Sequence, residues 1–173
     1  MFPAVTTQFR DDLSLDLHAT RGLIDALIRD GVSGLIVCGT VGENTSLTRP
    51  EEVAVMEAAK DAARGRVPVI AGSAEFACET AREAVRVGVD GVMVMPARVH
   101  SSKPHGTAAH FHGLVRATDL PTMAYNSPPI DRNDVTPDIL ASLAECDTVV
   151  GFKTLPATRA ASPTCAAWSA TAS

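Results

Sequence analysis

Three short segments of the chain carry side chains that could do chemistry, and each of them follows or closes an apolar run. Residues 39–43 read Gly-Thr-Val-Gly-Glu, residues 125–129 read Tyr-Asn-Ser-Pro-Pro, and Lys153 closes the run Thr148 to Phe152. A lysine at the end of a buried strand is costly to keep charged, and burial lowers the pKa of an amine. A neutral amine attacks carbonyl carbons and forms imines. Lys153 is therefore the candidate nucleophile.

The other two segments could hold and protonate a carbonyl substrate. Gly39 and Gly42 permit a tight turn in which successive backbone N–H groups converge on a carboxylate. The Thr40 hydroxyl can pass or accept a proton, and the phenol of Tyr125 can act as proton donor and acceptor over a bound carbonyl. Each segment taken alone also has a structural explanation, as a simple turn, a packed tyrosine or a lysine that reaches solvent.

Short apolar runs alternate with longer amphipathic patterns along the chain. The apolar runs have successive buried positions, as parallel strands covered on both faces do. Six strand-and-helix units predict a parallel sheet, either an open sheet or part of a (β/α)8 barrel, and both gather their sites at the carboxyl ends of strands. We predict strands at 3–8, 35–38, 68–71, 91–95, 121–125 and 148–153, helices at 15–29, 50–63, 79–87, 105–117 and 136–144, and glycine helix ends at Gly31, Gly65 and Gly88.

Composition narrows the class of protein. The 173 residues are 46% hydrophobic and 20% charged, which is typical of one globular domain. A net charge of −5 argues against nucleic acid or an anionic membrane as a partner. No apolar run approaches the roughly 18 residues of a membrane span, and the first residues lack the pattern of a signal peptide. Four scattered cysteines without a CxxC pair indicate reduced thiols, so we expect a cytoplasmic protein.

The histidines do not form a metal-binding pattern. His110 and His112 are two residues apart, a spacing that points them to different sides of a helix. We therefore predict no metal ion and no other cofactor. Glu43 is acidic and close to the proposed site, and we expect it to act as a structural hydrogen-bonding group rather than a catalytic one.

The end of the chain, 154–173, differs from the rest. It has one charged residue, Arg159, together with seven alanines and the only tryptophan, Trp168. A flexible tail is the plain interpretation. We favour a second one: loss of one base beside the Lys153 codon of a GC-rich gene would turn a polar, helix-like peptide into this tail. On this interpretation the chain is truncated by a frameshift after Lys153.

Taken together, in order and in spacing, the three segments resemble the dihydrodipicolinate synthase / N-acetylneuraminate lyase family. Members of that family have a GTTGE-like turn, a YNxP segment and a G-[IF]-K lysine on the second, fifth and sixth strands of a TIM barrel. The resemblance covers about residues 2–153. It implies a (β/α)8 TIM barrel of which this chain holds about six β/α units, strands one to six.

The resemblance also implies a reaction. Lys153 would condense with the ketone of pyruvate or a longer 2-oxo acid, and Tyr125, assisted by Thr40, would shuttle protons to and from the imine-forming oxygen. The imine itself supplies the electron sink, and full-length relatives are homo-oligomers, dimers or tetramers. The turn that would hold the substrate carboxylate consists of Gly39, Thr40, Val41, Gly42 and Glu43.

Several departures from the family pattern bear on which reaction occurs. Val41 replaces the second threonine of the turn, residues 96–102 contain no aromatic residue, and Ile130 stands where lysine-pathway synthases carry an arginine. These differences favour a dehydratase, deaminase or aldolase acting on a 2-oxo acid or imino acid, with Arg98 and His100 as candidate substrate contacts. The alternative is an inactive truncated remnant of such an enzyme; a nucleotide-binding open sheet is a weaker interpretation because no phosphate-binding motif is present.

Overall fold

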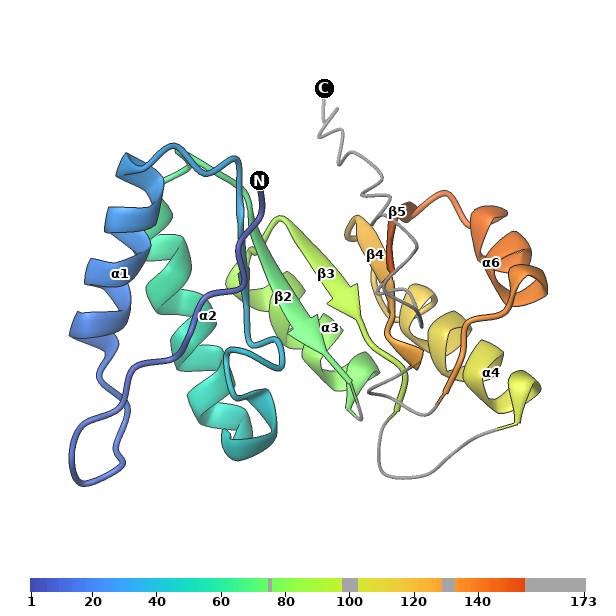
Figure 1. Ribbon diagram of the computed structural model, residues 1–173, viewed down its shortest axis with the longest axis horizontal. Coiled ribbons are helices and arrows are strands. Elements are labelled where there is room, and N and C mark those ends of the chain that lie inside the picture. The colour runs from blue at the N-terminus through green and yellow to red at the C-terminus, as the bar shows by residue number, and fades with distance from the viewer. Residues whose placement is uncertain (75, 98–102, 129–132, 155–173) are drawn as a thin grey trace.

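The computed structural model describes residues 1–74, 76–97, 103–128 and 133–154, which form a parallel five-stranded sheet with helices packed on one face (Figure 1). The strands lie in the order β1-β2-β3-β4-β5, each beside its neighbour in sequence. A doubly wound sheet reverses its order at a switch point, whereas a barrel does not. The strand order therefore identifies an arc of a (β/α)8 barrel and excludes the open-sheet alternative for the described residues.

The elements follow the predicted pattern closely. All five predicted helices are confirmed, with ends within two residues of the prediction. The structure contains strands β1 (Leu35–Val37), β2 (Val69–Ser73), β3 (Gly91–Val94), β4 (Thr122–Asn126) and β5 (Val149–Thr154), helices α1 (Leu17–Arg29), α2 (Arg49–Ala63), α3 (Ala77–Val87), α4 (Pro104–Val115) and α6 (Pro137–Ala144), and the 3-10 helix η1 (Asn44–Ser46).

The predicted first strand, residues 3–8, is wrong as a full strand. Only Ala4 forms an isolated parallel bridge, to Ile36, and the N–H of Val5 donates to the Ile36 carbonyl at 2.8 Å. Pro3 has no N–H to extend the pairing. Further along, the Thr7 hydroxyl donates to the carbonyl of Gly42 at 2.7 Å, which ties this segment to the turn after β1 rather than to the strand itself. The described residues thus form five strands instead of six.

Helix ends are set by local backbone chemistry. Gly31, Gly65 and Gly88 have φ angles of +84°, +70° and +78°, so the predicted glycine helix ends are confirmed. At the start of α2 the Glu51 carboxylate accepts hydrogen bonds from the N–H and the hydroxyl of Thr48, at 2.8 and 2.7 Å. The Glu51 side chain thereby satisfies the N–H of Thr48, the residue that caps the start of α2.

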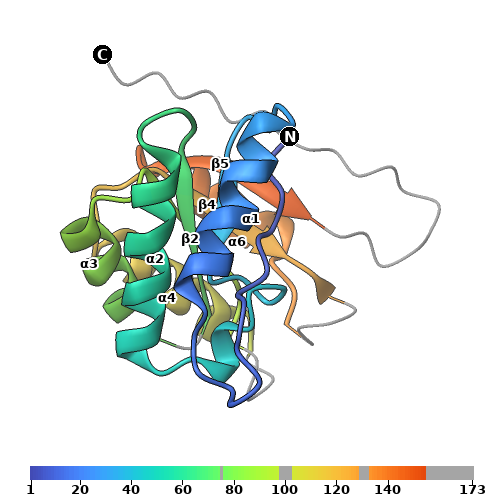
Figure 2. The same ribbon diagram turned by 90° about the vertical axis from the view of Figure 1, so that its left-hand side faces the viewer.

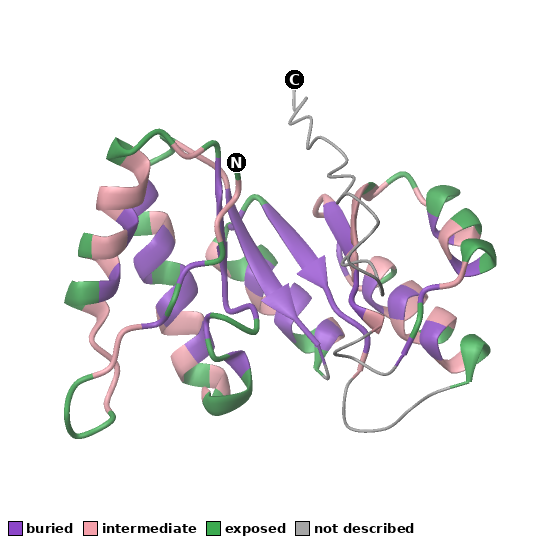
Figure 3. Cartoon of the chain, in the orientation of Figure 1, coloured by how far each residue is buried: buried purple, intermediate pink, exposed green. Residues whose placement is uncertain are grey.

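The sheet is packed on both faces, with a different set of side chains on each. Alternate residues of β1 to β4 face the helices and form the larger core, in which α1 also packs against α2 (Figure 2). The other face, which is the interior face of a barrel, carries a smaller cluster. Figure 3 shows β2 and β3 buried along their whole length. β5 is less buried than β1 to β3, and its Val150 is 39% exposed. The buried members of the smaller cluster are Ile36, Ile70, Ala74, Met93, Met95 and Met123.

The predicted boundary after Lys153 falls one residue before the end of β5, because Thr154 still pairs with Asn126. Residues 155–173 lie outside the described residues. The frameshifted or flexible tail therefore stays a prediction.

A close backbone approach holds the turn after β1 against β2. A Cβ atom on Gly72 would lie 2.8 Å from the Cα of Gly39 and 2.9 Å from the carbonyl oxygen of Cys38. Both obstacles are backbone atoms, which cannot rotate away. We expect Gly72→Ala to lower the free energy of unfolding by about 1–3 kcal/mol, as overpacking of a well-packed core does.

Urea unfolding followed by circular dichroism measures this effect, and Gly22→Ala is the matched control. No atom lies within 4 Å of a Cβ on Gly22, which is inside α1. The control is expected to raise the free energy of unfolding by about 0.5–1 kcal/mol, because alanine loses less conformational entropy in a helix. Equal free energies of unfolding for Gly72→Ala and the wild type would contradict the close backbone contact between Gly72 and Gly39.

Candidate active site

The structure places Lys153 and Tyr125 side by side at the carboxyl ends of β5 and β4. The two residues are paired in the parallel register, so their side chains lie on the same face of the sheet. The Nζ atom of Lys153 lies over the phenol ring, 4.7 Å from its centroid. Both side chains are half-buried. The ring face therefore stabilises a cation at this position.

An irregularity in the pairing of β4 with β5 decides which residue meets Tyr125. Thr122 pairs with Val149, but the next residue, Met123, pairs with Gly151, so Val150 is an extra residue on β5. Such a bulge re-aims the side chains that follow it. Without it the same register would set Phe152, not Lys153, beside Tyr125.

The residues around the bulge show the effect on both faces. A Cβ on Gly151 would lie 3.8 Å from Cγ of Met123, which puts Gly151 on the interior face below Lys153. Phe152 packs instead against the larger core under the helices. The lysine thus reaches the barrel interior while its apolar neighbour is buried on the helix side.

The turn at 39–43 bends from the end of β1 over the interior face. It is closed by hydrogen bonds from the N–H of Glu43 to the carbonyl of Thr40, at 3.1 Å, and from the N–H of Asn44 to the carbonyl of Gly39, at 3.3 Å. Glu43 adopts a left-handed φ of +58°. Among the described residues the N–H groups of Thr40 and Val41 have no hydrogen-bond acceptor, which leaves them available to an anionic ligand.

The Thr40 side chain lies over the end of β3. Its hydroxyl donates to the Sδ atom of Met95 at 3.5 Å, and Met95 is fully buried. The carbonyl oxygen of Met95 accepts a hydrogen bond from Nε2 of His110 at 2.9 Å. Within the described part of the chain, no hydrogen bond joins Thr40 to Tyr125 or to Lys153.

The remaining candidates fall in different places. Val41 and Glu43 are exposed on the turn, whereas Gly39 and Gly42 are buried in it. A Cβ on Gly42 would lie 3.0 Å from the carbonyl oxygen of Val5, so the turn requires glycine there. Arg98 and His100 lie outside the described residues, and their proposed contacts with substrate stay predictions.

Asn126 is a positioning residue that the sequence analysis missed. Its side chain is buried, donates to Asp134 Oδ1 at 2.8 Å and accepts from the N–H of Val135 at 3.1 Å. These bonds tie the end of β4 to the segment before α6, and so fix the strand end that carries Tyr125. A buried amide must find partners, and an asparagine directly after a strand was the signal available in the sequence.

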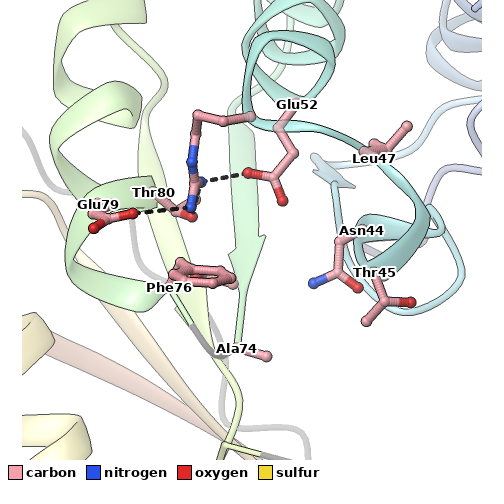
Figure 4. A pocket seen from close by; sticks show the side chains of 10 residues that line it. Asn44, Thr45, Leu47, Glu52, Ala74, Phe76, Glu79 and Thr80 are labelled. Carbon is pink, nitrogen blue, oxygen red and sulfur yellow. Dashed lines mark hydrogen bonds and ion pairs between the residues drawn. The ribbon is translucent and has the colours of Figure 1, made fainter.

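A pocket of about 600 Å³ lies beside the turn, between α2 and α3 (Figure 4). Asn44 lies on one side and Phe76 on the other, and the Arg49 guanidinium bridges Glu52 and Glu79 above them. Burial raises the pKa of the Glu52 carboxyl, against the opposing effect of Arg49. Lys153, Tyr125 and Thr40 do not line this pocket. Its walls consist of Asn44, Thr45, Leu47, Arg49, Glu52, Ser73, Ala74, Phe76, Glu79 and Thr80.

Neither a metal-binding group of side chains nor a helix suited to span a membrane occurs among the described residues. In these ranges no three or more histidine, cysteine or acidic side chains are grouped so that they could hold a metal ion. None of the described helices is both long and apolar enough to cross a membrane.

The comparisons with known proteins agree on one family. The model of the Dihydrodipicolinate synthetase family matches residues 1–161. A 4-hydroxy-tetrahydrodipicolinate synthase of Anaplasma marginale (strain Florida) is 36% identical over 157 residues, which are 88% of this chain and 52% of the relative. An uncharacterised DapA-like lyase of Rhizobium meliloti is also 36% identical, with the same coverage.

Solved structures agree with these relatives. The crystal structure of YagE, a prophage protein of the dihydrodipicolinic acid synthase family from E. coli K12 in complex with pyruvate, is 31% identical with a TM-score of 0.85. The match covers 91% of this chain and 54% of YagE. A dihydrodipicolinate synthase from Bacillus anthracis is 30% identical, with a TM-score of 0.85 over 88% of this chain and 54% of that one. The chain spans about half the length of the relatives it matches.

Proposed function

Because the chain belongs to the dihydrodipicolinate synthetase family, we propose that it is a Schiff-base lyase in which Lys153 condenses with pyruvate or a related 2-oxo acid. The observation that carries this proposal is the position of Lys153 Nζ, 4.7 Å from the ring centroid of Tyr125 on the interior face. The similar YagE structure holds pyruvate. Pyruvate is therefore the first substrate to test.

The arrangement supports a division of roles in imine formation. The neutral amine of Lys153 attacks the ketone carbon, and the oxygen leaves as water after it is protonated. The Tyr125 phenol supplies and removes protons at that oxygen, and Thr40 assists from the neighbouring turn. The N–H groups of Thr40 and Val41 hold the carboxylate. The positive iminium then withdraws electrons from the adjacent carbon, so that a C–C, C–O or C–N bond can break or form.

The finer part of the proposal concerns the branch of the family. The substrate is a single 2-oxo acid or imino acid that loses water or ammonia or undergoes aldol cleavage, rather than the pair of substrates of a lysine-pathway synthase. The support is Val41 in the turn, which is 54% exposed and offers no hydroxyl, together with Ile130 and the non-aromatic segment 96–102. Mass spectrometry of the reaction mixture tests this point. If pyruvate is consumed only when a second substrate, an aldehyde with a carboxylate group, is also present, the result would favour the synthase.

Borohydride reduction in the presence of pyruvate tests the imine itself. The wild-type chain is expected to gain one reduced pyruvate adduct on the peptide that contains Lys153, because borohydride converts the imine to a stable amine. The chain's other lysines are internal controls, since Lys103 is exposed and Lys60 is paired with Asp90 at 2.9 Å. An equal yield on all three lysines would indicate non-specific reaction.

The second candidate function, an inactive remnant, makes the opposite prediction. In that case the protein is soluble and folded, as circular dichroism reports, but no peptide gains the adduct at any pyruvate concentration. Among the described residues β5 pairs with β4 alone, and its Val150 is 39% exposed; this unpaired edge is the observation that favours the alternative.

A further inference from the structure

A thiol, an imidazole and a hydroxyl meet between α4 and the end of α6, away from the proposed active site. The Nδ1 atom of His112 lies 3.9 Å from Sγ of Cys146, and its Nε2 atom lies 3.1 Å from Oγ of Ser142. The carbonyl of Cys146 accepts the N–H of Val149, the first residue of β5. The cluster therefore lies at the amino end of the strand whose carboxyl end carries Lys153.

The hydrogen bonds of Ser142 fix the tautomer of His112. A serine hydroxyl has one hydrogen, and that of Ser142 is donated to the carbonyl of Ile139 at 2.8 Å. Towards His112 the hydroxyl can only accept, so Nε2 carries the proton. The lone pair of Nδ1 then faces the Cys146 thiol. This is the relation of nucleophile, base and orienting group that activates nucleophiles in proteins.

The Cys146 thiol lies within reach of two polar groups of the cluster. The Nδ1 atom of His112 is one of them, at 3.9 Å. The thiol also lies 3.9 Å from the carbonyl of Ser142, which is an acceptor but not a base. His112 is the group in the cluster that can take the proton. The side chain of Cys146 is half-buried, so small reagents can reach it.

We propose that Cys146, His112 and Ser142 form a thiol-modification site for low-molecular-weight disulfides. The Cys146 sulfur attacks one sulfur of the disulfide RSSR and forms a mixed disulfide, and the second sulfur leaves as RS⁻. The thiol proton passes to His112 Nδ1 and then to the leaving sulfur, so that RSSR and the Cys146 thiol give Cys146-SSR and RSH. The disulfide is the oxidant and no other reagent is needed. This inference is independent of the proposed lyase activity.

Timed reaction of the whole chain with glutathione disulfide, followed by peptide mass spectrometry, tests the site. Cys78 is the internal control, because it is also half-buried and forms no hydrogen bond with a histidine in the described ranges. Cys38 is buried, burial raises its pKa to about 12, and its modification would report unfolding. We expect Cys146 to react at least about tenfold faster than Cys78 in the folded protein. Equal rates at the two thiols would overturn the proposal.

Removing the base distinguishes a thiol activated by His112 from a thiol that reacts only because it is accessible. In folded His112→Gln, the rate at Cys146 is expected to fall to about that of Cys78, while the rate at Cys78 stays unchanged. A Cys146 that keeps its wild-type rate without His112 would overturn the proposal. Ser142→Ala removes only the orienting group and is expected to slow Cys146 alone; it provides the same comparison if His112→Gln does not fold.

Discussion

Lys153→Arg is expected to abolish the borohydride-trapped pyruvate adduct. Arginine stays protonated at every accessible pH and has no neutral amine to attack a ketone. Its cation can still lie over the ring of Tyr125, as the lysine does at 4.7 Å, so the packing at the end of β5 changes little. The loss is therefore chemical rather than structural. Peptide mass spectrometry after reduction measures it.

A second lysine of the chain and the thermal stability of the variant provide the controls. Lys103→Arg changes an exposed lysine at the start of α4 and is expected to leave the adduct yield unchanged. Thermal unfolding of Lys153→Arg should match the wild type within a few degrees. A variant that still forms the adduct, on Lys60 or Lys103, would show that the imine is not specific to the proposed site.

Much of the fold could be predicted from the sequence because its signals are local. The helices α1 and α2 follow from apolar spacing and from the capping residues at their ends, and the strands β2 and β3 are continuous apolar runs. Each of these elements depends on residues close together in sequence. Parallel strands joined by one helix tend to lie side by side, but that tendency left the open sheet and the barrel undecided until the order β1-β2-β3-β4-β5 was seen.

What the sequence did not reveal depends on pairing between distant segments. The extra residue Val150 exists only with reference to β4, so an apolar run gives no hint that Lys153 rather than Phe152 will face the barrel interior. The same is true of Gly72, whose need for glycine comes from the backbone of Gly39 on the neighbouring strand end. Asn126 likewise has its partners in the segment before α6.

The error at residues 3–8 has a related cause. The apolar, β-branched start of the chain predicts a strand. A strand, however, also needs backbone N–H and carbonyl groups that pair with those of a neighbouring strand. Proline at position 3 lacks a backbone N–H, and the side-chain hydroxyl of Thr7 donates to the carbonyl of Gly42. The segment therefore serves the turn after β1, which is the proposed carboxylate site. The local pattern predicted a full strand, and only the isolated bridge between Ala4 and Ile36 forms.

Tyr125→Phe is expected to slow imine formation by about 10²-fold or more, the lower end of what a positioned proton donor contributes. The substitution keeps the ring under Lys153 Nζ and its contacts with the interior cluster, and removes only the hydroxyl. Since that hydroxyl has no hydrogen bond within the described residues, the free energy of unfolding should change by less than about 1 kcal/mol. The rate of adduct formation, sampled by rapid quenching into borohydride, is the measurement.

Tyr125→Leu separates the two roles of the side chain. If the phenol transfers the proton, phenylalanine and leucine slow the reaction to a similar extent, because both lack the hydroxyl. If the ring acts mainly as a face for the cation, only leucine slows it, because phenylalanine offers the same π surface. A phenylalanine variant as fast as the wild type would remove Tyr125 from the proton relay and leave Thr40, 3.5 Å from Met95 Sδ, as the hydroxyl to test next.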